Sequence, residues 1–213
     1  QTMYRLRAAA VLISLLAASC ARKASGPVDE QVLRRYLLAR SLYSQDRLEE
    51  SLEVLLENHE RAPDFASNSF LIGKIYFFKE QFELAQRYWE KTLAGSPHHL
   101  DTVKWLARLY LLKERADLAG QILSQALAES SEDPELLILM GKVCRSRDEL
   151  ERAIEFYTKA QLFTERLAEA SIDLAEIYSR FAMNERAERE LRKALALLGE
   201  QGPVSRSLAA ALR

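Results

Sequence analysis

Basic residues recur in this chain at a fixed interval of 34 residues. They are Arg40, Lys74, Arg108 and Lys142, and the next member of the series is Glu176. Lys104 lies four residues before Arg108, which is one turn of an α-helix. Guanidinium and ammonium groups bind carboxylates through charge-assisted hydrogen bonds. The spacing therefore indicates recognition of an acidic or carboxylate-bearing partner.

Large aromatic residues accompany the first basic residues. They are Tyr36, Tyr43, Phe70, Phe77 and Phe78. Aromatic rings beside Arg and Lys make good anchors for a binding partner. Two alternatives stay open: the rings can pack on one another, and the basic groups can pair with acidic neighbours such as Asp101 and Glu135.

No residue pattern indicates catalysis or a metal site. His98 and His99 follow Pro97 in a predicted loop, and His59 ends a predicted helix. No Cys or carboxylate lies at ligand spacing from these histidines. A Gly-rich phosphate loop and a Ser/His/Asp order are also missing from the sequence. We therefore predict that the chain is not an enzyme and needs no cofactor or metal.

The composition favours an all-α globular fold. Of 213 residues, 48% are hydrophobic and 29% are charged, which is typical of globular chains and not of disordered ones. Only seven Gly and five Pro occur, while Ala, Leu and Glu are abundant. The formal net charge is −1, and no long block of like charge suggests a nucleic-acid partner.

The same interval also organises the residues that must position these side chains. With Val32 as position one of a repeat, position eight is Ala39, Gly73, Ala107, Gly141 and Ala175, and position twenty is Ser51, Ala85, Ala119, Ala153 and Ala187. Position twenty-four is larger, with Leu55, Trp89, Leu123, Tyr157 and Leu191. Small residues at two fixed positions predict that two helices approach closely in each repeat, and larger residues fill the grooves between neighbours.

This pattern resembles the tetratricopeptide repeat over residues 32–201. The unit of that family is about 34 residues long, which is the interval seen here. The resemblance implies an α-solenoid of five helix-turn-helix units in a right-handed superhelix. Leu208, Ala209 and Leu212 keep the same phase, so residues 202–213 are expected to form a helix that caps the last apolar face.

The resemblance also implies a concave groove, lined by the first helix of each unit at positions two, five, nine, twelve and thirteen. The predicted partner-binding groove then contains Tyr36, Arg40, Tyr43, Phe70, Lys74, Phe77, Phe78, Lys104, Arg108 and Lys142. Lys104 and Arg108 match a pair with which some co-chaperones of this family hold a terminal carboxylate. Arg40 and Lys74 stand where those proteins carry Asn, so a cationic groove is predicted without that particular ligand.

The N-terminal residues have the pattern of a targeting signal. Arg5 and Arg7 make the segment of residues 3–7 positively charged, residues 8–19 carry no charge, and small residues precede Cys20. This resembles the lipobox of bacterial lipoproteins, although Ala17 stands where Leu is usual. The resemblance implies a signal peptide over residues 1–19, acyl chains such as palmitate on Cys20, and a linker over residues 20–31. An uncleaved anchor and an ordinary signal peptide remain alternatives.

The resemblance places the chain on the bacterial cell envelope. Ala21 is not the aspartate that retains enteric lipoproteins in the inner membrane, which implies the periplasmic face of the outer membrane. The leading functional hypothesis is a membrane-anchored scaffold that binds proteins or extended peptides, as pilotins and outer-membrane assembly factors do. The alternative is an accessory subunit of a solute uptake system that docks a periplasmic binding protein. An open, charged groove favours the scaffold, and a closed, apolar cavity favours the uptake subunit.

Overall fold

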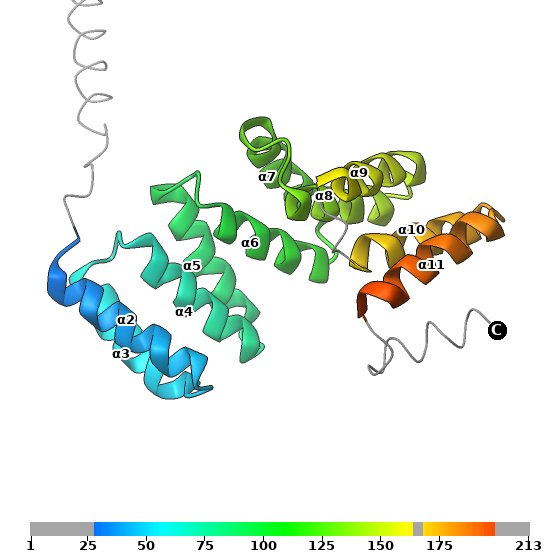
Figure 1. The fold of residues 1–213 in the computed structure, drawn as a ribbon. Helices are drawn as coiled ribbons and strands as arrows, with labels where there is room; N and C mark the ends of the chain where they lie inside the picture. Colours follow the sequence, from blue (N-terminus) through cyan, green and yellow to red (C-terminus); the bar gives the residue numbers. More distant parts are fainter. Residues whose placement is uncertain (1–27, 164–167, 199–213) are drawn as a thin grey trace, which may run out of the picture. The chain divides into compact units, whose positions relative to one another are not determined.

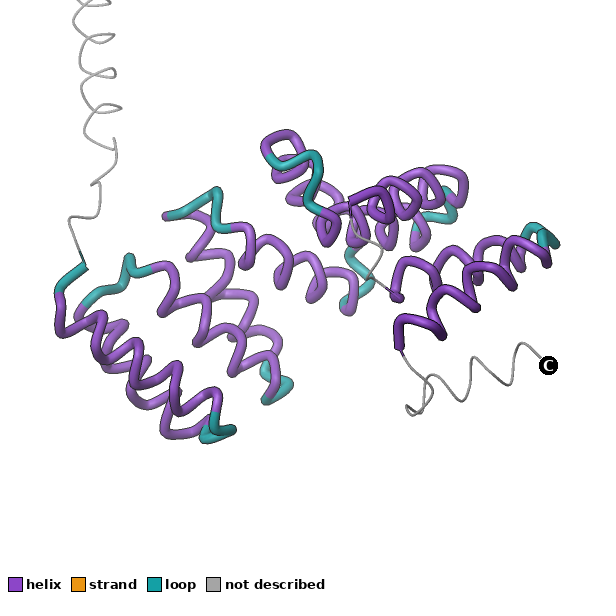
Figure 2. The backbone as a smooth tube through the Cα atoms, in the orientation of Figure 1, coloured by secondary structure: helices purple, strands orange, loops and turns teal. Residues whose placement is uncertain are grey.

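A computed structural model describes residues 28–163 and 168–198 of the chain. Within these ranges the protein consists of helices and turns, with no strand (Figures 1 and 2). The helices are α2 (Glu30–Ser44), α3 (Leu48–Arg61), α4 (Ala66–Phe78), α5 (Phe82–Gly95), α6 (Leu100–Leu112), α7 (Ala116–Glu129), α8 (Pro134–Ser146), α9 (Leu150–Phe163), α10 (Ala168–Arg180) and α11 (Asn184–Leu198). The predicted all-α class is confirmed. Cys20, the signal segment and the predicted capping helix over residues 202–213 lie outside the described residues.

The helices belong to two compact units. The first, residues 1–65, holds α2 and α3, and the second, residues 66–213, holds α4 to α11. Inside each unit every even-numbered helix packs against the helix that follows it. The first helices of the last four repeats begin at Ala66, Leu100, Pro134 and Ala168, which keep the interval of the basic series. None of the described helices is both long enough and apolar enough to cross a bilayer.

Local sequence signals set where the helices begin. Asp133 caps α8 by accepting hydrogen bonds from the backbone N–H groups of Glu135 and Leu136, each at 3.0 Å. Pro134 follows at the first helical position, where its missing N–H costs nothing. His99 caps α6, where Nδ1 accepts from the N–H of Thr102. The His99 side chain therefore has a structural role.

The turn inside each repeat uses a left-handed residue. Asp46, Glu80, Glu114, Asp148 and Ala182 have φ between 56° and 61°, and they recur at the repeat interval. In each turn the following N–H bonds back to the carbonyl five residues earlier, as from Gln81 to Tyr76 at 2.9 Å. This bond closes the end of the first helix and turns the chain into the second. Because none of the five is glycine, each turn carries some backbone strain.

The predicted close approach of positions eight and twenty is seen in the first repeat, where Ser51 Oγ donates a hydrogen bond to the carbonyl of Ala39 at 2.7 Å. Position eight also lies against the large residue at position twenty-four. A Cβ atom added to Gly73 would lie 2.3 Å from Nε1 of Trp89, and one added to Gly141 would lie 2.6 Å from the ring of Tyr157. The three repeats with Ala at position eight have Leu at position twenty-four. A smaller residue at position eight is therefore matched by a larger residue at position twenty-four, which keeps the volume between the two helices filled.

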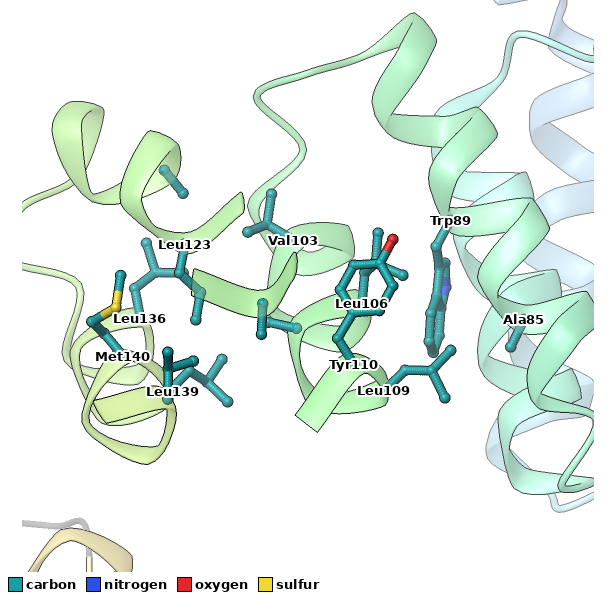
Figure 3. Close-up of a cluster of buried hydrophobic side chains, with 14 residues drawn as sticks. Ala85, Trp89, Val103, Leu106, Leu109, Tyr110, Leu123, Leu136, Leu139 and Met140 are labelled. Carbon is teal, nitrogen blue, oxygen red and sulfur yellow. The ribbon is translucent and has the colours of Figure 1, made fainter. Parts of the chain in front are cut away.

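Two large apolar clusters lie in the described part of the second unit. The first joins side chains of α5, α6, α7 and α8, and in Figure 3 Trp89 faces Leu109 and Tyr110. The second joins α8, α9 and α10 and includes Cys144, which is 1% exposed. Burial raises the pKa of the Cys144 thiol, so this cysteine acts as a small hydrophobic residue. These clusters hold the first helices of repeats three to five in fixed register.

Candidate functional site

A pocket with a volume of about 300 Å³ lies along the first helices of the last three repeats. Its lining comes from α6, α8 and α10 and consists of Arg108, Leu111, Leu112, Glu135, Ile138, Leu139, Lys142 and Glu169. All of these residues except Leu139 stand at positions two, five, nine, twelve or thirteen. The structure thus brings Arg108 and Lys142 to one surface, together with apolar side chains. We call this surface the α6–α10 groove.

The basic residues of the groove are paired with acidic residues of the next repeat. Lys104 Nζ lies 2.7 Å from Oδ2 of Asp133 and 3.0 Å from Oε2 of Glu135. Arg108 also pairs with Glu135, and Lys142 pairs with Glu169. The pairing with Glu135 is the alternative that the sequence left open. Each position-nine base here meets the position-two acid of the following repeat, so the α6–α10 groove is a ladder of ion pairs and not a row of bare cations.

Electrostatics holds these pairs in their charged forms. Partial burial disfavours the charge of Lys104, but its hydrogen bonds to Asp133 and Glu135 outweigh burial and raise its pKa. Burial would likewise raise the pKa of Asp133 and Glu135, and the bonds from Lys104 and Arg108 reverse this and lower both. Lys104, Asp133 and Glu135 are therefore ionised at neutral pH. A ligand carboxylate can enter only by replacing or sharing an existing partner.

Trp105 joins the basic and aromatic parts of the site, and the sequence analysis did not identify it. Lys74 Nζ lies 5.0 Å from the centre of the Trp105 ring, and the guanidinium carbon of Arg108 lies 5.5 Å from it. Lys74 also lies 5.9 Å from the ring of Phe70. Cation–π contacts of this kind hold basic groups over aromatic faces. The sequence spacing could have identified Trp105, because it precedes Arg108 by three residues and therefore shares its helix face.

The two predicted phenylalanine anchors have different environments. Phe77 is half-buried and packs among Phe82, Trp89 and Trp105, with ring centroids 5.4–5.9 Å apart. Phe78 is 52% exposed and meets Trp105 edge-on. Phe77 therefore fits the alternative in which the aromatic rings pack on one another, whereas Phe78 presents more surface to a partner.

Comparison with known proteins identifies the repeat. The tetratricopeptide repeat family pattern matches residues 79–143. Among solved structures, that of pilF from Pseudomonas aeruginosa is 17% identical, covers 86% of this chain and 83% of its own, and has a TM-score of 0.76. The chain therefore carries tetratricopeptide repeats over the matched residues.

Two further solved structures share this fold. MamA from Desulfovibrio magneticus RS-1 is 18% identical, with 82% of this chain and 99% of that chain covered and a TM-score of 0.71. YrrB, described as a tetratricopeptide repeat protein with an unusual peptide-binding site, is 21% identical, with 83% and 89% covered and a TM-score of 0.64. At these identities the likeness concerns the fold alone.

The first tetratricopeptide repeat carries the remaining predicted groove residues. Tyr36 packs edge-on against Phe65, with ring centroids 5.2 Å apart. Arg40 is exposed, and Tyr43 is half-buried. These residues belong to the first compact unit, and Lys74 to Lys142 belong to the second.

The histidines belong to no metal-binding cluster in the part of the chain that the structure describes. His98 Nδ1 lies 2.5 Å from Oε2 of Glu129 at an exposed position, and His99 caps α6. Over residues 28–163 and 168–198, no group of three or more His, Cys, Asp or Glu converges to hold a metal ion. What the α6–α10 groove offers chemically is binding through paired charges and an apolar floor.

Proposed function

We propose that this protein is a membrane-anchored tetratricopeptide scaffold that binds an extended segment of a partner protein in the α6–α10 groove. The observation that carries the proposal is the pocket itself. Leu112 is 57% exposed beside two ion pairs, Arg108 with Glu135 and Lys142 with Glu169. An apolar side chain of a partner can cover Leu112, while its carboxylate exchanges with Glu135 or Glu169.

The ion pairs make this binding mode selective. A partner carboxylate that takes the place of Glu169 keeps Lys142 paired, so the exchange leaves no buried charge alone. A neutral partner segment gains no such bond, and it covers only the apolar floor. We therefore expect the partner segment to combine a large apolar residue with an acidic group.

The cellular part of the proposal follows from the sequence. Acylation of Cys20 would anchor the scaffold on the periplasmic face of the outer membrane, where it would serve assembly of a membrane or surface machine, as pilotins do. A role in solute uptake would call for a closed apolar cavity, and four of the eight pocket-lining residues are charged. The ion-paired groove thus favours the scaffold.

A photo-crosslinker placed at Leu112 in living cells tests the groove. We expect covalent adducts with a partner from this position, and none from the matched position Ser124, which is exposed on α7. The double change Lys142→Glu with Glu169→Lys keeps an ion pair but reverses its direction. It should lower the adduct yield about tenfold without changing the thermal unfolding temperature. Equal adducts from positions 112 and 124 would place the binding surface elsewhere.

The anchor is tested separately. Cys20→Ser should release the chain from the membrane fraction and abolish incorporation of labelled fatty acid. A full-length, membrane-bound chain with an unmodified Cys20 thiol would contradict the lipoprotein assignment and leave the groove unaffected.

A further inference from the structure

Helix α2 exposes three leucines. Leu33, Leu37 and Leu38 are 43%, 50% and 53% exposed. Leu38 stands at position seven, and its counterparts Ile72, Leu106, Met140 and Leu174 are at most 6% exposed. In later repeats position seven is therefore covered, and among the described residues no helix precedes α2 to cover Leu38. We call Leu33, Leu37 and Leu38 the α2 leucine face.

The position of this face in the chain indicates what covers it. Nine residues from Cys20 to Val28 span at most about 30 Å when fully extended, so an acylated Cys20 would hold α2 close to the bilayer. Residues 21–40 contain five basic and two acidic residues, and Arg34 and Arg40 on α2 are exposed, with Arg34 in an ion pair with Glu30 at 2.6 Å. A surplus of basic residues beside exposed leucines fits the surface of a bilayer that contains anionic lipid.

A second copy of the chain is a weaker candidate for this place. A stable interface between proteins buries roughly 1,200 Å² or more in total, and three partly exposed leucines on one helix supply much less apolar surface. A bilayer needs no such area, because an acyl anchor in the same membrane makes a weak contact intramolecular and raises its effective concentration.

We propose that the α2 leucine face docks on the lipid surface, so that the first repeat lies on the bilayer. This proposal rests on the proposed function insofar as the acyl chain brings α2 to the membrane. The leucines enter the boundary between headgroups and acyl chains, and the arginines remain at the headgroups. The first repeat then has a second role besides any contact with a partner.

Vesicle binding by a chain without an acyl group tests this directly. The protein is residues 20–213 with Cys20→Ser, and an environment-sensitive fluorophore is attached at Ser41→Cys, which lies on the α2 leucine face. Ser124→Cys on α7 is the matched control, because both serines are exposed, and the buried Cys144 is protected from labelling. With phosphatidylcholine vesicles containing about a third phosphatidylglycerol, we expect a blue shift at position 41 and none at position 124.

The leucines are tested by the triple change Leu33→Ser, Leu37→Ser and Leu38→Ser. It should lower the vesicle partition coefficient about tenfold or more. Because all three side chains are exposed, the thermal unfolding temperature should stay within a few degrees of the parent. A partition coefficient equal to that of the parent would overturn the proposal.

Other outcomes separate the alternatives. No shift at position 41, or equal shifts at positions 41 and 124, would contradict docking through α2. A shift that rises with protein concentration in the absence of vesicles would identify a second copy as the occupant and also overturn the proposal. The tested chain carries no acyl group, so the vesicle-binding result does not depend on whether Cys20 is acylated. Acylation of Cys20 is measured independently, from the mass of the protein isolated from envelopes.

Discussion

Two kinds of contact between helices, here called seams, hold the repeats together, and different forces act in each. Inside a repeat, position eight of one helix meets position twenty-four of the next, and at Gly73 there is no room for one methyl group beside Trp89. Between successive first helices, charged side chains form pairs such as Lys142 with Glu169, whose side chains are 28% and 54% exposed. The first seam is steric and dry, and the second is electrostatic and partly wet.

The difference explains which surface is available for binding. A close-packed contact cannot change partner without leaving a cavity or a clash. A partly exposed ion pair can exchange its acid for another carboxylate at little cost, because its net stabilisation is small. The repeat therefore keeps its shape through the first seam and can offer the second to a partner.

The largest effect is expected at the steric seam of repeat two. Gly73→Ala should destabilise the protein by about 1–3 kcal/mol, because Trp89 must move from its place. Trp89→Leu should cost about 2–4 kcal/mol, through a cavity and the lost hydrogen bond from Nε1 to the carbonyl of Phe70. The double variant copies repeat three, which has Ala107 and Leu123, and should cost about 1–3 kcal/mol less than the two single changes together. Urea unfolding of the four proteins measures the coupling.

Repeat three supplies the control for this cycle. Ala107 and Leu123 are fully buried without an aromatic ring at either position. Ala107→Gly should lower stability by about 1 kcal/mol, from helix propensity and one lost methyl group. If the changes at Gly73 and Trp89 prove additive, the two positions do not exchange volume as a pair.

An intermediate effect is expected where the two seams meet, at Asp173. Its carboxylate pairs with Arg145 at 2.8 Å, and burial raises its pKa despite the attraction of Arg145. A raised carboxyl pKa means that the folded state holds a proton which the unfolded state has already lost. Stability from this group is therefore present at low pH and is lost as pH rises above about 4 and through the folded pKa. Over that pH range, the free energy of unfolding of Asp173→Asn should rise relative to that of the wild type by on the order of 1 kcal/mol.

Glu135 gives the opposite sign in the same experiment. The bonds from Arg108 and Lys104 outweigh its burial and lower its pKa, so its contribution is present at neutral pH and is lost as pH falls through the folded pKa. In thermal melts from pH 3 to 7, both variants should diverge from the wild type as pH rises, Asp173→Asn as the more stable protein and Glu135→Gln as the less stable one. Parallel curves would mean that neither carboxyl differs from its unfolded state.

The smallest effect is expected at the ionic seam itself. A double-mutant cycle of Lys142→Ala and Glu169→Ala should give a coupling of about 0.2–1 kcal/mol at low salt. The coupling should shrink further at 1 M salt, where the Debye length is about 3 Å. A salt-independent coupling above about 2 kcal/mol would show that this seam is as rigid as the steric one, and that exchange with a ligand carboxylate is too costly.

Part of the candidate site could be predicted from the sequence because the period fixes which residues share a helix face. Position nine placed Arg108 and Lys142 on one surface, and the structure brings them into one pocket. The ion pairs depend on how far one first helix lies from the next, and no sequence period gives that distance. Phe77 and Phe78 are adjacent in the chain, yet the packing of Trp89 and Trp105 decided that Phe77 is largely enclosed.

The sequence by itself determined the repeat, the all-α class and the positions that must be small, since a fixed period of small and large residues fits helix pairs of constant geometry. The structure adds that the turns recur at the same interval, with a left-handed residue at Asp46, Glu80 and Glu114. Only the tertiary structure decided that Arg108 and Lys142 are neutralised by acids of the following repeat and that the leucines of α2 remain uncovered. The physical reason is that a charge or an apolar side chain acquires its role from what lies within a few ångströms in space, and residues of different repeats come that close only when the repeats stack.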